Sequence, residues 1–196
     1  MRNILKIKNS FGFTLLELLI AMVIFSIIII AFVALFLSAI KEQRKILNLN
    51  NLINSTSYSL EYMDRAIRMA RKDVSANSEC VGATAGYKYN FGTSTPAVTL
   101  RFLTFDNKCW EFSKQGDQLV VKKSNDIKRS GLGAAETLTP IDLVVKTVSF
   151  EVLGDGQAED KQPKVTLNLI MNTKDNPAQE RIFQTTISQR NLNVEQ

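Results

Sequence analysis

Residues 18–40 read LLIAMVIFSIIIIAFVALFLSAI, a block of 23 uncharged residues in which Ser26 and Ser38 are the only polar side chains. A helix of this length spans about 34 Å, which is enough to cross a hydrocarbon core of about 30 Å. A buried core helix is one alternative, but the rest of the chain is too small to enclose a helix that is apolar on every side. The block therefore predicts a single transmembrane helix.

A cleaved secretory signal is the other alternative for this block. The apolar region of such a signal is about 7–15 residues long and ends in a cleavage site of small residues. The block is longer, and residues 37–39 (Leu-Ser-Ala) match that site only weakly. Basic residues flank both ends of the block almost equally, so charge alone favours a cytoplasmic N-terminus only slightly.

A distinctive segment lies directly before the block: residues 12–17 read GFTLLE and follow a short leader with three basic residues. Glu17 places a lone carboxylate at the start of an apolar helix, where such groups are costly and normally paired or functional. The chain offers Glu17 no nearby basic side chain, since Lys8 lies outside the apolar helix. The alternative is that Glu17 only extends toward the lipid headgroups.

In residues 12–17 the chain resembles the type IV pilins and the pseudopilins of type II secretion, whose leader pattern G-F-T-L-x-E appears here without departure. The resemblance implies that a prepilin peptidase cleaves after Gly12 and that the new amine of Phe13 is methylated. Gly12 suits that site because a residue without Cβ lets the enzyme approach the backbone closely. The resemblance also implies that Glu17 meets the Phe13 amine of an adjacent subunit and sets the register of assembly.

Location and partners are implied by the same resemblance. The protein is expected in the bacterial inner (cytoplasmic) membrane as a single-pass protein, with a cytoplasmic N-terminus and an extracytoplasmic globular domain, and afterwards in a filament. Its expected partners are the prepilin peptidase, other pilin or pseudopilin subunits, the inner-membrane assembly platform with its ATPase, and membrane lipid before assembly.

The helix is expected to continue beyond the membrane. No Gly or Pro interrupts residues 13–81, and apolar residues recur every three or four positions from Leu49 to Val74. We therefore expect one helix from about Thr14 to Lys72, transmembrane in its first half and amphipathic in its second half. The polar run at residues 48–59 is the expected place for bending or local melting.

After Gly82 the periodicity of the apolar residues changes from 3.6 to 2, which predicts strands. The fold class is therefore expected to be α+β, with the long N-terminal helix packed on an antiparallel β-sheet. The predicted strands lie at residues 98–105, 108–112, 118–122, 143–153, 165–171 and 182–188, and the main loops at residues 124–139, 154–163 and 172–179.

The patterns and the resemblance together give four expected parts: a cleaved leader (residues 1–12), a transmembrane and filament-core helix (13–40), its amphipathic continuation (41–75) and a β-rich globular domain (76–196). In outline, the last part resembles the larger minor pseudopilins, which favours a minor subunit.

The composition disfavours most enzyme chemistry. The chain has no histidine and only two cysteines, and it shows no Walker or Rossmann glycine pattern. We therefore expect a protein that is not an enzyme, with no catalytic residues, cofactor or metal. The alternative to a cleaved, prepilin-like filament subunit is an uncleaved, membrane-anchored binding or enzymatic domain.

Charge does not favour a nucleic-acid partner. Residues 76–196 contain 14 basic and 14 acidic residues, which is poor material for binding phosphates. A basic cluster on the second half of the helix is expected to be a solvated face, although DNA and lipid headgroups are alternative ligands. Its members are Arg65, Arg68, Arg71 and Lys72.

The two cysteines and one acidic loop are expected to have structural roles. Cys80 and Cys109 are expected to form a disulfide in an oxidising compartment, and two buried free thiols are the alternative. A loop with Asp155, Glu159 and Asp160 offers oxygen ligands for calcium, but its spacing matches no EF-hand, which favours a solvated acidic loop.

Overall fold

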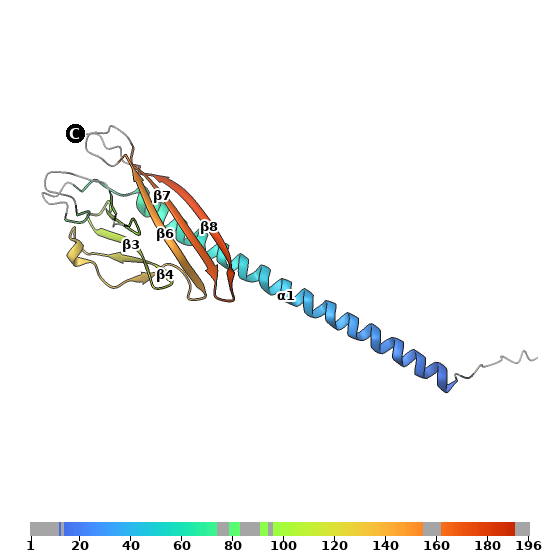
Figure 1. Ribbon diagram of the computed structural model, residues 1–196. Helices are drawn as coiled ribbons and strands as arrows, with labels where there is room; N and C mark the ends of the chain where they lie inside the picture. Colours follow the sequence, from blue (N-terminus) through green and yellow to red (C-terminus); the bar gives the residue numbers. More distant parts are fainter. Residues whose placement is uncertain are drawn as a thin grey trace, which may run out of the picture. The chain divides into compact units, whose positions relative to one another are not determined.

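The computed structural model describes residues 12, 14–73, 79–82, 91–93, 96–154 and 162–190. Within these residues, the helix α1 (Leu15–Arg68) is followed by strands and a short 3-10 turn, η1 (Arg129–Gly131) (Figure 1). The strands are β1 (Phe91–Thr93), β2 (Thr99–Leu103), β3 (Cys109–Gln115), β4 (Gln118–Lys123), β5 (Glu136–Thr137), β6 (Leu143–Leu153), β7 (Lys164–Thr173) and β8 (Asn176–Ser188). The chain divides into two compact units, residues 1–47 and residues 48–196.

The first unit contains the apolar part of α1. The most apolar window of the helix is 0% buried in the structure, so its large side chains lie on the outside of the chain. By length and composition, this helix can cross a membrane. The expected long apolar N-terminal helix is confirmed.

The polar run at residues 48–59 is helical throughout, so the expected local melting is wrong. Two of its hydroxyl groups bond to carbonyl groups of the same helix. The hydroxyl of Thr56 donates to the carbonyl of Leu52 at 2.7 Å, and that of Ser59 to the carbonyl of Ser55 at 2.9 Å. Polar side chains that bond back to their own helix do not have to interrupt it.

The strands of the second unit form two antiparallel sheets. Sheet A has the order β1-β2-β3-β4-β5, and sheet B has the order β6-β7-β8. The predicted α+β class is confirmed, with two sheets in place of the single sheet expected. Alternation along a strand shows which residues face the core, but it does not show which strands pair.

Several strand limits differ from those predicted. The short strands β1 and β5 were not predicted, and most of the loop expected at residues 172–179 belongs to β7 and β8. Polar residues and Pro177 suggested a loop there. In the structure, the side-chain amide of Asn172 donates to the carbonyl of Pro177 at 2.7 Å, which supports the hairpin beside an irregularity between Met171 and Thr173.

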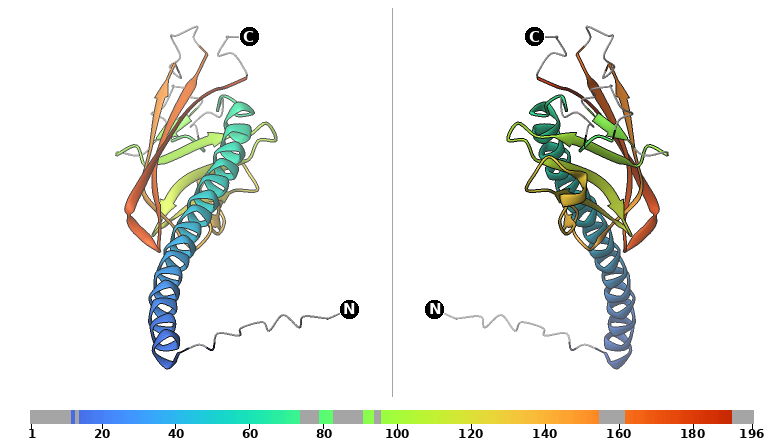
Figure 2. Two further views of the ribbon diagram at one scale, coloured as in Figure 1. Left: turned by 90° about the vertical axis from the view of Figure 1, so that its right-hand side faces the viewer. Right: turned by 90° about the vertical axis from the view of Figure 1, so that its left-hand side faces the viewer.

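The core of the second unit lies between α1 and both sheets (Figure 2). From α1, the buried face includes Leu52, Met63 and Ile67, at helical spacing. These residues share one apolar cluster with side chains from both sheets: Leu100, Phe102, Phe112 and Val121 from sheet A, and Val145, Phe150, Leu167, Leu169 and Met171 from sheet B. The predicted amphipathic continuation of the helix therefore packs as expected.

The helix ends at Arg68, four residues earlier than predicted, because segments from elsewhere bond to the residues that follow. The amide of Arg71 donates to the carbonyl of Leu103 on β2 at 2.8 Å. The carbonyl of Arg68 accepts from the amide of Arg190 at 2.9 Å, and the carbonyl of Ala70 accepts from the side-chain amide of Gln189 at 2.5 Å. These bonds satisfy carbonyl groups at the end of the helix that lack helical partners.

A cationic side chain, Lys123 of β4, connects α1 to sheet A. Its Nζ lies 5.2 Å from the centroid of the Trp110 ring and 5.8 Å from that of Tyr62, and it forms an ion pair with Glu136. Burial by itself lowers the pKa of Lys123, but hydrogen bonds and charge interactions with Glu136 and Tyr62 raise it overall. We call Lys123, Tyr62, Trp110 and Glu136 the lysine clamp.

Candidate processing and assembly site

The predicted cleavage site begins at an open position. Gly12 is exposed, and no heavy atom lies within 4 Å of the point that a Cβ atom would occupy there. Phe13, the predicted methylated residue, lies outside the described residues. Nothing in the described chain obstructs an approach to Gly12.

Thr14 and Glu17 form a reciprocal arrangement at the start of α1. The backbone amide and the hydroxyl of Thr14 both donate to Oε2 of Glu17 at 3.4 Å, and the amide of Glu17 donates to the hydroxyl of Thr14 at 3.3 Å. This is the geometry of a capping box, in which a Thr before the helix and a Glu three residues later satisfy each other's amides. Thr14 therefore helps to position Glu17.

Thr14 is a further site residue that the sequence could have indicated. The signal is the spacing Thr-x-x-Glu directly before an apolar run, which marks the start of a helix. The capping box also refines the interpretation of Glu17. Among the described residues, no basic side chain forms an ion pair with the Glu17 carboxylate, but Thr14 donates two hydrogen bonds to this carboxylate.

The apolar part of α1 presents its side chains to the surroundings. Phe32 and Leu35, for example, are 74% and 71% exposed. A continuous apolar surface of this size marks a protein that contacts a membrane or other proteins. Lipid tails or neighbouring apolar helices can cover it, and both are consistent with a membrane anchor.

Two members of the basic cluster on the second half of the helix, Arg68 and Arg71, form local interactions. Arg68 forms an ion pair with Asp64 at 2.7 Å, and the hydrogen bond to Asp64 raises the pKa of Arg68. Arg71 donates from Nη1 to Oδ1 of Asn107 at 3.1 Å, on the turn between β2 and β3. These two arginines therefore serve the fold and do not form a shared phosphate-binding surface.

Cys80 and Cys109 form a disulfide with a Cα–Cα separation of 5.4 Å. Both cysteines are buried with Val81 and Leu103 in a small apolar cluster beside sheet A. The bond attaches the segment that follows α1 to the first residue of β3. The alternative of two free thiols is therefore wrong for this structure.

No metal site is found among the residues that the structure describes, since no three His, Cys, Asp or Glu side chains gather there. The acidic loop with Asp155, Glu159 and Asp160 lies outside those residues.

Comparison with known proteins identifies one family feature. A family model described as the prokaryotic N-terminal methylation motif matches residues 7–33, from the end of the leader into the apolar helix. No curated protein and no solved structure matches the chain. The match supports a type IV pilin-like or pseudopilin-like protein, and the motif implies processing by a prepilin peptidase and assembly with other pilin subunits.

Proposed function

We propose that this protein is a prepilin-like structural subunit, a minor pilin or a pseudopilin, of a type IV pilus or a type II secretion pseudopilus. Prepilin peptidase cleaves it between Gly12 and Phe13, and Phe13 is methylated. The observation that carries this proposal is the overlap of the methylation motif at residues 7–33 with the apolar part of α1, whose most apolar window is 0% buried.

Assembly moves the apolar helix from lipid into a bundle of similar helices. Both environments are apolar, so hydrophobic burial contributes little to the difference in free energy. Packing between helices and the pairing of Glu17 with the amine of a neighbouring Phe13 then determine whether the subunit stays in the filament. An external ATPase supplies the energy of extraction, and the subunit itself acts without catalysis or a cofactor.

The proposed orientation has a cytoplasmic N-terminus, and the unit of residues 48–196 lies outside the inner membrane. The disulfide between Cys80 and Cys109 supports this orientation. Disulfides form and persist in oxidising compartments and are rare in the bacterial cytosol.

The intact mass of protein extracted from membranes tests the proposal. We expect a chain that begins at Phe13 and carries one added methyl group. Replacing Gly12 with a branched residue (Gly12→Ile) should leave the full-length chain in the membrane, because the added side chain blocks close approach of the peptidase to the backbone. A wild-type chain that still begins with Met1 would instead support the uncleaved, membrane-anchored domain.

A further inference from the structure

The strand β8 has a long unpaired edge. It is the outer strand of sheet B, and β7 pairs only one of its sides. The opposite edge of the sheet, on β6, is partly used: the amides of Val145 and Phe150 donate to the carbonyls of Asp117 and Ala97, both at 2.8 Å. Within the described part of the chain, no strand pairs with the outer edge of β8.

Hydrogen bonds at the end of β8 show which of its backbone groups point outward. The amide of Gln189 donates toward β7, to the carbonyl of Pro163 at 2.9 Å, whereas the amide of Arg190 donates away from it, to the carbonyl of Arg68 at 2.9 Å. Backbone groups alternate in direction along an antiparallel strand. Because the register to β7 is constant from Arg181 to Ser188, the amides and carbonyls of the even-numbered residues point outward, and these residues include Ile182, Gln184 and Thr186.

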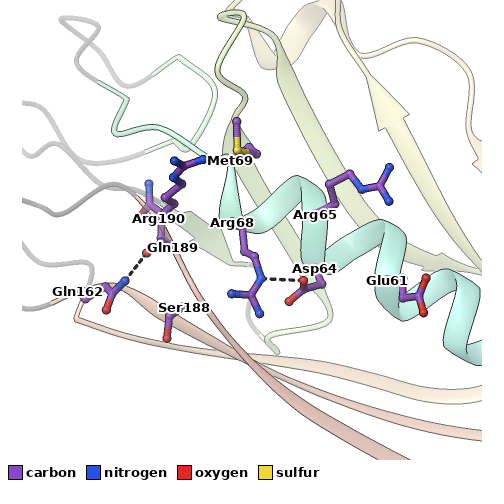
Figure 3. A pocket seen from close by; sticks show the side chains of 9 residues that line it. All are labelled: Glu61, Asp64, Arg65, Arg68, Met69, Gln162, Ser188, Gln189 and Arg190. Atoms are coloured by element: carbon purple, nitrogen blue, oxygen red, sulfur yellow. Dashed lines mark hydrogen bonds and ion pairs between the residues drawn. The ribbon is translucent and has the colours of Figure 1, made fainter.

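A groove of about 550 Å³ lies where this edge meets the end of α1 (Figure 3). Three arginines and two carboxylates line it, so positive charge is in excess: Glu61, Asp64, Arg65, Arg68 and Arg190. The Arg68–Asp64 pair is internally neutral, and no ion pair involves Arg65 or Arg190 within the described residues. In the same groove, Oε1 of Gln189 is buried without a hydrogen-bond partner.

We propose that the outer edge of β8 accepts an extended, acidic segment of a different polypeptide as an additional strand. Strand addition uses the free main-chain groups of an edge, and side-chain pockets provide specificity. The main chain of the added segment bonds to Ile182, Gln184 and Thr186. Its carboxylates lie in the groove beside Arg190 and Arg65, and one of its N–H groups reaches Oε1 of Gln189.

A second copy of this chain does not fit that edge. If its β8 paired antiparallel to this one with the same sheet face, its α1 would run in the opposite direction. Two subunits anchored in one membrane cannot adopt that arrangement. This exclusion of antiparallel pairing rests on the proposed function. If the two β8 strands paired in parallel and in register, each Arg190 would lie beside the other in a groove that is already cationic, which like charges disfavour.

Amide hydrogen exchange on the full chain in detergent micelles tests the proposal with two synthetic peptides, acetyl-TVTITVTDD and acetyl-TVTITVTKK. Without peptide, the outward amides of Ile182, Gln184 and Thr186 should exchange faster than the inward amides between them. The acidic peptide should slow the exchange of the outward amides roughly tenfold or more, and the basic peptide should bind more weakly. Hydrogen exchange along β8 does not depend on cleavage at Gly12. The strand-addition proposal can therefore fail while the proposed function holds, and the reverse is also possible.

Two variants sharpen the test. Gln184→Pro removes one outward N–H without removing a bond to β7 and should abolish protection by the acidic peptide, whereas the matched control Gln184→Ala keeps the N–H and should bind normally. Arg190→Glu changes only the charge of a side chain and leaves the backbone N–H groups in place, so it remains informative if the proline variant unfolds. We expect Arg190→Glu to reverse the preference between the two peptides. Absence of protection by both peptides, equal binding by the proline and alanine variants, or an unchanged preference in Arg190→Glu would each overturn the proposal.

Discussion

At the scale of single residues, the capping box separates two possible roles of Glu17. One role is local: its carboxylate accepts from the backbone amide and hydroxyl of Thr14 and orders the start of α1. The other role depends on its negative charge, which pairs with the amine created at Phe13. A glutamine at position 17 can still form a capping box but carries no charge, so the two roles can be tested independently.

We predict that Glu17→Gln and Glu17→Ala are both cleaved after Gly12 and that both fail to enter filaments, because both lack the charge. Thr14→Ala keeps the charge and loses the cap, which is worth about 1 kcal/mol, so its incorporation should fall only moderately, and Thr14→Ser should restore it. The measurement is the share of each variant in sheared filaments relative to membranes. Normal incorporation of Glu17→Gln would show that the charge has no part in assembly.

At the scale of elements, the lysine clamp connects α1, β3, β4 and β5. Trp110 is the one tryptophan of the chain, so its fluorescence reports directly on the clamp. We predict that Lys123→Met lowers the free energy of unfolding of the second unit by about 1 kcal/mol, through loss of the cation–π contacts and an ion pair that is partly exposed. Urea unfolding followed by Trp110 fluorescence measures this change, and Lys146→Met on the exposed side of β6 is a control that should leave stability unchanged.

The clamp also predicts a dependence on alkaline pH. The pKa of Lys123 is raised in the folded protein, so the charged clamp contributes fully below the lysine pKa of the unfolded chain, about 10.4, and its contribution is lost as pH rises through the folded value. As pH rises above about 10.4, the wild type should therefore lose more stability than Lys123→Met. Equal losses in the two proteins, measured by urea unfolding, would argue against the clamp.

Features that depend on local sequence could be predicted, and those that depend on distant segments could not. The apolar helix lies in one continuous stretch, so its composition and length indicated it, whereas the expected roles of Gly12, Phe13 and Glu17 came from the resemblance of residues 12–17 to type IV pilins and pseudopilins. The end of α1 at Arg68 depends instead on hydrogen bonds from β2 and from the end of β8. The two sheets and the free edge of β8 likewise depend on strand pairing, which alternation along one strand does not determine.

At the scale of the whole molecule, the chain combines two units with different requirements. The unit of residues 1–47 exposes an apolar surface that needs lipid or other helices, whereas the unit of residues 48–196 has its own core and a disulfide. The second unit can therefore be stable while the first exchanges one apolar environment for another, as the proposed assembly requires.

We predict that replacing both cysteines (Cys80→Ser with Cys109→Ser) lowers the free energy of unfolding by about 3 kcal/mol, because the bond closes a loop with a sequence separation of 29. Urea unfolding of both proteins, with and without a reductant, measures the effect. Reductant should destabilise the wild type and leave the double variant unchanged. A wild type that is insensitive to reductant even when unfolded would indicate that the bond is absent in the cell.

The bonds between the end of α1 and the segment after β8 have a mechanical consequence. The carbonyl of Arg68 is held by Arg190 and that of Ala70 by Gln189, residues more than 100 positions away along the chain. Within the unit of residues 48–196, tension on the end of α1 is therefore transmitted directly to the segment that follows β8. Separating these two segments requires both hydrogen bonds to break, so the end of α1 is mechanically coupled to sheet B through the last described residues of the chain.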